Sequence, residues 1–309
     1  MKRSEEKEAA SSSKKQKGQT EWRVSFEQST VGLRTLFDVV GNVLTSVNIR
    51  LYKKRDEHHL CIDSIDPQHV CMIQARLSCD EGENIDEEGV QFCVQSKTLN
   101  HCLGSIPQHY SVEISKREGS EDVYVVGYES MSNSHKMIFK LHTLLDESET
   151  MSLNVLDYRH TVEIDLSTLR QIVKMSSTLK SDLIEIVVEE PEEGEMGGVV
   201  HSVLKIRSEG DAAQEHQFVS CLVDSSKEER VIRAAMDTSM PPLDQSIRMK
   251  TLYKDSFSTH YLGLFLKSME RQVIVMKISE EKPLILNYPL GAEESFICFV
   301  LAPRQEDGQ

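Results

Sequence analysis

The stretch Ser29-Thr30-Val31-Gly32-Leu33-Arg34 returns in shortened form as Ser167-Thr168-Leu169-Arg170. In both places a predicted strand precedes the motif and a predicted helix contains or follows it. A second pair appears in the same order, with His-Cys-Leu-Gly at residues 101–104 and His-Tyr-Leu-Gly at residues 260–263. Two matched pairs in one order indicate an internal duplication.

The hydrophobic periodicity predicts few helices and many strands. Helical spacing covers residues 33–47 and 169–179, and less regularly 96–106 and 256–269. Most of the remaining chain reads as short alternating runs, at residues 22–26, 47–51, 70–77, 110–114, 123–128, 136–142, 161–164, 183–188, 199–206, 216–223, 273–278, 284–288 and 295–301. This pattern excludes doubly wound and barrel α/β folds and predicts an α+β fold of two similar β-rich domains, each with two helices.

Composition shifts set the expected boundaries. Residues 1–20 are rich in Lys, Glu and Ser, cannot bury a core, and are expected to be disordered. Two basic clusters in this tail have the spacing of a bipartite nuclear localisation signal, which predicts a nuclear protein or one at a viral replication site; a merely solvated tail is the alternative. The clusters comprise Lys2, Arg3, Lys14, Lys15 and Lys17. We expect domains at 21–142 and 161–304, a linker at 143–160 and a polar tail at 305–309.

Several classes of protein are disfavoured. The formal net charge of −15 argues against a surface that is basic all round. The longest apolar run is too short to span a membrane, and without a hydrophobic leader we expect a protein that is not secreted. Seven cysteines without a C-x-x-C pair predict reduced thiols. His58 and His59 are expected to be solvated in a polar turn. Without a nucleotide, metal or catalytic motif, the chain is predicted to be no enzyme and to hold no metal or cofactor.

The basic residues gather on the predicted helices. These segments and their ends carry a single acid, Asp38, so the remaining chain has 50 − 1 = 49 acids against 35 − 6 = 29 Lys and Arg. An exposed helix face is the ordinary explanation for any one of these helices. All of them together suggest a surface that meets DNA phosphates. The candidate DNA-facing residues are Arg34, Lys97, His101, Arg170, Lys174, Lys180, His260 and Lys267.

Three further segments carry a resemblance to a known family. Ser-Ile-Asp-Pro-Gln-His-Val at residues 64–70, Lys-Pro-Leu-Ile-Leu-Asn-Tyr at 282–288 and Val-Leu-Ala-Pro-Arg at 300–304 resemble the segments S-M-D-S-S-H-V, V-P-L-V-V-E-Y and Y-L-A-P-K of the proliferating cell nuclear antigen (PCNA) family of DNA sliding clamps. The resemblance covers roughly residues 21–304 and implies a homotrimer, closed head to tail, that encircles double-stranded DNA with its helices lining the hole. It also implies that the clamp tethers DNA polymerase and other replication and repair proteins, and that an ATP-driven clamp loader opens it.

The resemblance further implies a pocket for partner peptides beneath the linker. Apolar residues there suit a helical turn with aromatic side chains. Core packing would explain each position taken alone. The matching positions are Ile65, His69, Val70, Met72, Leu153, Val155, Pro283, Ala302 and Pro303.

Departures from the family pattern indicate a divergent member, of a kind that a large DNA virus could encode. Thr35 and Gly41 stand where the family carries lysines, and His260 stands for an arginine. Acidic Glu189 and Glu190 follow the strand where many members carry a modifiable lysine. Two alternatives stay open: a subunit of a heterotrimeric checkpoint clamp, and a non-encircling viral processivity factor that binds DNA by charge.

Overall fold

The computed structural model describes residues 20–129, 135–145, 158–191, 202–210, 215–224, 231–234, 249–267, 269, 273–291 and 294–304. The five residues of the predicted import signal (Lys2, Arg3, Lys14, Lys15 and Lys17) lie outside this part of the chain. So do Leu153 and Val155 of the predicted pocket, and most of the predicted linker.

The two halves repeat one order of elements. The first half comprises β1(Thr20–Phe26), α1(Thr30–Val43), β2(Ser46–Lys54), β3(Glu57–Ile65), β4(Cys71–Cys79), β5(Glu81–Glu83), β6(Val90–Gln95), α2(Ser96–Ser105), β7(Ser111–Arg117), β8(Asp122–Tyr128) and β9(Lys136–His142). The second half comprises β10(His160–Asp165), α3(Leu166–Thr178), β11(Leu183–Pro191), β12(Ser202–Glu209), β13(Glu215–Asp224), β14(Val231–Ala234), β15(Met249–Ser258), α4(Thr259–Leu266), β16(Val273–Ile278), β17(Leu284–Pro289) and β18(Phe296–Leu301). The described elements therefore confirm the predicted α+β class with two helices in each half.

Several predicted boundaries were wrong. The helix predicted over residues 33–47 ends at Val43, because Leu44 adopts an extended backbone and Ser46 begins β2. Leu44 and Val47 are still buried, so their apolar character reflects the core and not the helix. The start of the helix predicted over 256–269 is the end of β15. The sequence predicts no strand at β3, β5, β6, β14 or β15, and it predicts a polar turn at His58 and His59, where the structure has the start of β3.

The strands of the described residues form two sheets. One has the order β5-β1-β7-β8-β9, and the other has the order β15-β11-β12-β13-β14-β10-β16-β17-β18-β4-β3-β2-β6. The second sheet runs through both halves, because β18 pairs antiparallel with β4 from Phe296 opposite Arg76 to Leu301 opposite Cys71. This pairing makes one continuous surface from residues that are more than two hundred positions apart.

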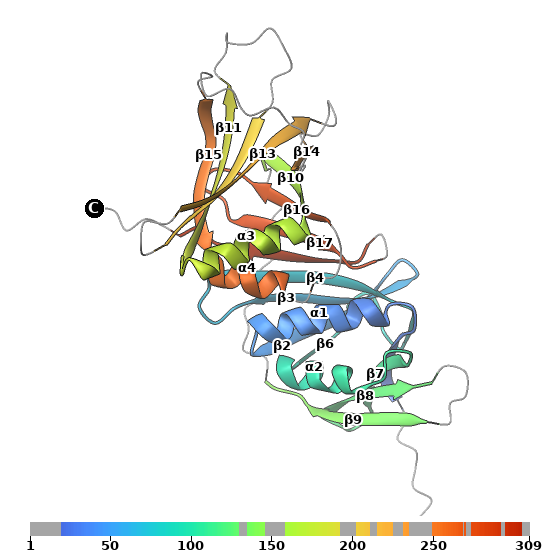
Figure 1. The fold of residues 1–309 in the computed structure, drawn as a ribbon. Coiled ribbons are helices and arrows are strands. Elements are labelled where there is room, and N and C mark those ends of the chain that lie inside the picture. The colour runs from blue at the N-terminus through green and yellow to red at the C-terminus, as the bar shows by residue number, and fades with distance from the viewer. Residues whose placement is uncertain are drawn as a thin grey trace, which may run out of the picture.

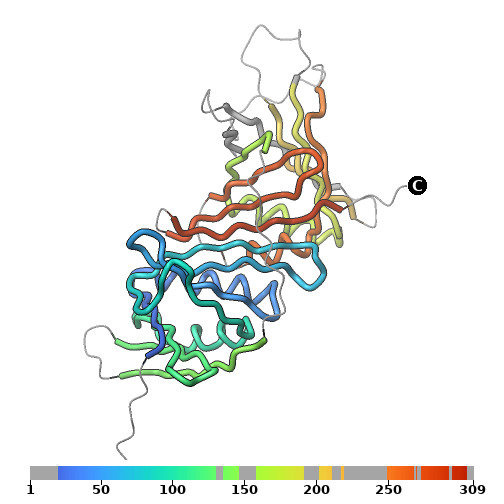
Figure 2. Tube along the Cα trace, turned by 180° about the vertical axis from the view of Figure 1, so that it is seen from behind, coloured from blue at the N-terminus to red at the C-terminus, as the bar shows by residue number. Residues whose placement is uncertain are grey.

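The helices lie on one side of the sheets. Figure 1 shows α3, α4, α1 and α2 in a row in front of the strands, and Figure 2, from behind, shows the strands as the opposite surface. α1 packs on α2, α3 packs on α4, and α1 contacts α4 across the middle. The apolar side of each helix is buried in the main core; in α1 and α3 it comprises Leu33, Leu36, Phe37, Val40, Leu169, Ile172 and Val173. No helix among the described residues is both long and apolar enough to cross a membrane.

Two phenylalanines anchor the second half against the central strands. Phe265 of α4 stacks on Phe299 of β18, with ring centroids 4.3 Å apart, and both side chains are fully buried. Phe299 lies opposite Ile73 in the β18–β4 pair. The stack therefore ties a helix to the strand that joins the two halves.

We expect Phe265→Ala to lower the free energy of unfolding by about 3–5 kcal/mol, because it leaves a cavity under that strand. Urea denaturation followed by circular dichroism measures the loss. Met175→Ala, an exposed position on α3, is the control and should change stability by less than about 0.5 kcal/mol. Equal effects of the two substitutions would contradict this description of the core.

Candidate DNA-facing and partner-docking surfaces

The outward side of the helices carries most of the predicted DNA-facing residues. All of them except Arg34 are exposed. Lys97 and His101 lie on α2, while Arg170 and Lys174 lie on α3. Lys180 follows α3, His260 lies on α4, and Lys267 is the C-cap of α4. The helices that carry these residues form one row on the same side of the sheets (Figure 1).

The two arginines of the duplicated motif have a structural role in this face. Arg34 donates from both terminal nitrogens, Nη1 to the carbonyl of Ile106 and Nη2 to that of Pro107, each at 2.8 Å. Arg170 donates from Nε to the carbonyl of Leu266 at 2.9 Å and also to the carbonyl of Met269. Each guanidinium thus binds carbonyls at the end of the neighbouring helix, where unpaired carbonyls concentrate negative charge.

The arginine of the duplicated motif makes the same kind of contact in both halves. Arg34 is half-buried, and burial lowers the pKa of its guanidinium. α1 therefore presents little free positive charge, and its exposed acid Asp38 accepts a hydrogen bond from Asn100 at 3.2 Å. In the described part of the chain, the exposed lysines of this face lie on α2, on α3 and at the ends of α3 and α4. The helical face is acid-poor and only thinly basic.

The loop between β3 and β4 is organised by one buried carboxylate. Asp66 is 3% exposed. Its Oδ1 accepts from the backbone N–H groups of Val70 at 2.8 Å and Cys71 at 2.5 Å, and its Oδ2 accepts from that of Gln68 at 3.1 Å. These bonds support His69 at a positive φ of 56°, a conformation that few non-glycine residues adopt.

The same carboxylate reaches the other half of the chain. Tyr261 of α4 donates its hydroxyl to Asp66 Oδ2 at 2.6 Å. Burial first, and then the bond to Asp66, raise the pKa of Tyr261, so its phenol stays protonated as a donor. Beyond β18, the N–H of Ala302 donates to the carbonyl of Val70 at 2.9 Å. The loop is therefore held from both halves.

An apolar strip lies beside this loop. Met72, Cys298 and Val300 form a small buried cluster, separate from the main core, with partly buried Ile65, Ile285 and Phe296 packed against it. Phe296, Cys298 and Val300 alternate along β18, and Ile285 of β17 and Met72 of β4 lie opposite Val300, so these side chains share the sheet face away from the helices. Burial raises the pKa of the Cys298 thiol to about 11, which leaves it protonated.

The structure brings together only some of the predicted pocket residues. Ile65 and Met72 lie in the strip, whereas Val70 packs against the main core. His69 instead lines a cleft of about 350 Å³ with Ile65, Leu44, Asn48 and Cys93. The carbonyl of Pro283 accepts a hydrogen bond from Tyr158 at 2.9 Å. Ala302 is exposed and Pro303 half-buried.

The prediction omitted several members of the strip. Ile285, Phe296, Cys298 and Val300 lie in it, although the predicted strands contained all of them. The period-2 alternation of β18 could have found them, since Phe296, Cys298 and Val300 must share a face.

The comparisons with known proteins agree with this geometry. No protein-family model matches the chain. Proliferating cell nuclear antigen 1 of Plasmodium falciparum, in the isolates K1 and 3D7, is 22% identical over 289 residues, which cover 89% of this chain and 94% of the relative. The match to the crystal structure of PCNA from Entamoeba histolytica covers 93% of this chain and 100% of that chain, with a TM-score of 0.68 and 14% identity. The match to the crystal structure of PCNA from Thermococcus kodakaraensis covers 92% of this chain and 100% of that chain, with a TM-score of 0.67 and 16% identity.

The chain therefore has the fold of DNA sliding clamps. The particular clamp that it resembles is PCNA, to which it stands as a divergent relative. The resemblance inferred from the three sequence segments is confirmed.

We expect Arg34→Met to lower the free energy of unfolding by about 2 kcal/mol, because a charged donor to two helix-end carbonyls is lost. Lys174→Met, which changes a projecting cation, should alter it by less than about 0.5 kcal/mol. Urea titration of both variants measures this difference. An Arg34 variant as stable as the parent would show that the helix-end contact contributes nothing.

A second expectation concerns the β3–β4 loop. Asp66→Ala removes the acceptor of several buried donors and should cost about 3 kcal/mol, whereas Tyr261→Phe removes one hydrogen bond and should cost about 1 kcal/mol. Chemical denaturation with both variants and the double variant tests the coupling. Strictly additive losses would contradict a shared hydrogen bond.

Proposed function

We propose that the chain is one subunit of a DNA sliding clamp, a ring that encircles duplex DNA and tethers DNA polymerase and other clients. It acts in this proposal as a scaffold, without catalytic activity of its own. The observation that carries the proposal is the duplication, because it supplies both halves of a head-to-tail joint.

The joint between the two halves of the chain indicates how one subunit would join the next. β18 is the last strand of the second half and pairs with β4 of the first half. The corresponding elements of the duplication are β9, last in the first half, and β13, in the position of β4. Pairing of β9 of one subunit with β13 of the next would repeat the internal joint and continue the ring.

In the described part of the chain, β9 has an unpaired edge, and β13 has one along part of its length. Within the described residues β9 pairs with β8 alone, and β13 pairs with β14 only from Leu222 to Asp224. On β9, Ile138 is 57% exposed, and its exposed neighbours on that face are Lys136 and Lys140. An open edge strand with an exposed apolar residue favours pairing with another chain. The resemblance to PCNA supports three subunits.

The helical face would then meet DNA. In a closed ring, topology holds the duplex, so the lining needs only to avoid repelling phosphates. An acid-poor and thinly basic face suits that role. Opening such a ring requires energy from outside, and we propose a separate clamp-loading ATPase as its source.

The apolar strip and the Asp66 loop form the proposed client site. Aromatic residues of a short peptide would cover Ile65, Met72 and Val300, next to Pro283 and the exposed Ala302. The predicted import signal in the tail makes the nucleus, or a viral replication site, the proposed location.

Light scattering and DNA retention test the ring. We expect light scattering to give a mass that is a multiple of the subunit mass. The assembly should stay on nicked circular DNA and slip off when that DNA is linearised. If charge alone held the protein, its retention on DNA would not change on linearisation and would fall steeply as the salt concentration rises. A monomer with that behaviour would exclude the ring.

The β9 edge can be tested separately. Ile138→Asp places a charge on the proposed joint and should convert the assembly into monomers that circular DNA no longer retains. Val273→Asp is the matched control, since Val273 is 46% exposed on β16, a strand that is paired on both sides. A ring that tolerates Ile138→Asp as well as Val273→Asp would remove β9 from the joint. Failure of the purified chain alone to assemble, with rings forming only with other subunits, would instead favour a heterotrimer.

A further inference from the structure

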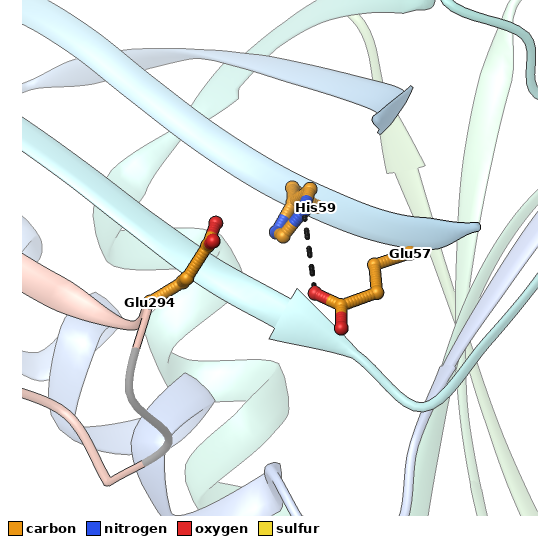
Figure 3. Close-up of side chains that lie close together, drawn as sticks. All are labelled: Glu57, His59 and Glu294. Carbon is orange, nitrogen blue, oxygen red and sulfur yellow. Dashed lines mark ion pairs between the residues drawn. The ribbon is translucent and has the colours of Figure 1, made fainter. Parts of the chain in front are cut away.

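A buried histidine lies between two carboxylates from opposite halves of the chain. Figure 3 shows Glu57 and His59 from β3 beside Glu294, which comes from the segment before β18. One donor atom from each residue lies within 4.8 Å of the other two. The sequence predicts a solvated His59, but only 1% of the surface of this residue is exposed, so the prediction is wrong.

The strand register explains the convergence. Glu57 and His59 are two positions apart on β3 and therefore point to the same face of the sheet. Ser78 on β4 lies opposite His59, so both belong to the same face of the sheet. The N–H of Ser78 donates to Ser295 Oγ at 3.0 Å, and the N–H of Leu290 donates to the carbonyl of Ser295 at 2.8 Å. These bonds fix the position from which Glu294 projects.

The imidazole has no hydrogen-bond partner in the described part of the chain. Its Nδ1 is buried and unpaired, and its Nε2 lies 3.9 Å from Glu57 Oε2, too far for a hydrogen bond. A buried imidazole beside two carboxylates has the composition of a metal site, because histidine is the commonest metal ligand in proteins.

We propose that Glu57, His59 and Glu294 bind a zinc-like divalent transition-metal ion that links the two halves of the subunit. One imidazole and two carboxylates supply three ligands, and water can complete a tetrahedral shell. An imidazole in the set favours Zn²⁺ over Mg²⁺ or Ca²⁺, which prefer oxygen ligands alone.

The three donor atoms must move closer together to bind the ion, and the two carboxylates can move because their side chains are exposed. Ligands of a tetrahedral zinc ion lie roughly 3.4 Å apart, given bonds of about 2.1 Å. The carboxylates belong to exposed side chains, with relative exposures of 68% for Glu57 and 45% for Glu294. Lys54 and Arg76 hold Glu294 at 3.8 and 3.7 Å. These cations position the carboxylate and compete with the ion, so we expect micromolar affinity.

Calorimetric titration of the full chain with Zn²⁺ tests the site. We expect a site of one ion per chain that Glu57→Gln and Glu294→Gln each weaken by at least about tenfold. Both substitutions are at exposed positions and preserve side-chain shape, so folding is retained. Glu280→Gln, an exposed glutamate in the turn after β16, is the matched control and should bind like the parent.

Thermal unfolding supplies a second readout. Zn²⁺ should raise the Tm of the parent and of the Glu280 variant, because binding to the folded state alone stabilises it. Zn²⁺ should not raise the Tm of either ligand variant. Millimolar Mg²⁺ should not reproduce the increase in Tm that Zn²⁺ causes in the parent. Parent-like affinity in both ligand variants, or no heat of binding up to about 100 μM Zn²⁺, would overturn the proposal. Neither measurement involves DNA, so the result is independent of the proposed clamp function.

Discussion

The backbone pairing of β18 with β4 is the interaction on which the rest of the structure depends. It joins the two duplicated halves into one sheet and brings the loop after β3, the residues that directly follow β18 and the turn before β18 to one place. The Phe265–Phe299 stack covers one side of the joint, and the strip of Met72, Cys298 and Val300 covers the other. The proposed peptide site and the proposed metal site both lie along this seam.

The duplication also explains which charges on the helical face have structural partners. Arg34 and Arg170 occupy matched positions and both bind the end of the adjacent helix. A protein with few basic residues on that face thus uses two of them to hold its helix pairs together. Among the described residues, Lys97 and Lys174 are exposed on the helices, and in the proposed ring they would be the cations that meet DNA.

The fold could be predicted from the sequence because its signals are local. Helical periodicity, strand alternation and the repeated Ser-Thr and His-x-Leu-Gly motifs lie within short windows. β3 was missed because Glu57, His58 and His59 are polar, although neighbouring strands and their side chains cover His59. The role of Arg34 depends on carbonyls about seventy positions away, and Glu294 meets His59 only through the β18–β4 pairing. Such contacts are set by the tertiary fold and leave no pattern of spacing.

The continuity of the chain distinguishes the internal joint from its proposed counterpart between subunits. When β18 leaves β4, the two strands remain tethered, so they meet again at the effective concentration that the connecting chain imposes. When β9 separates from β13 of a neighbouring subunit, no chain connection links the two strands, and only the other contacts of the ring keep them close. Two joints of similar chemistry therefore differ in how readily they reclose. In the proposed ring, the β18–β4 pairing within each subunit stays closed. The β9–β13 pairing between subunits is the one that opens to admit DNA.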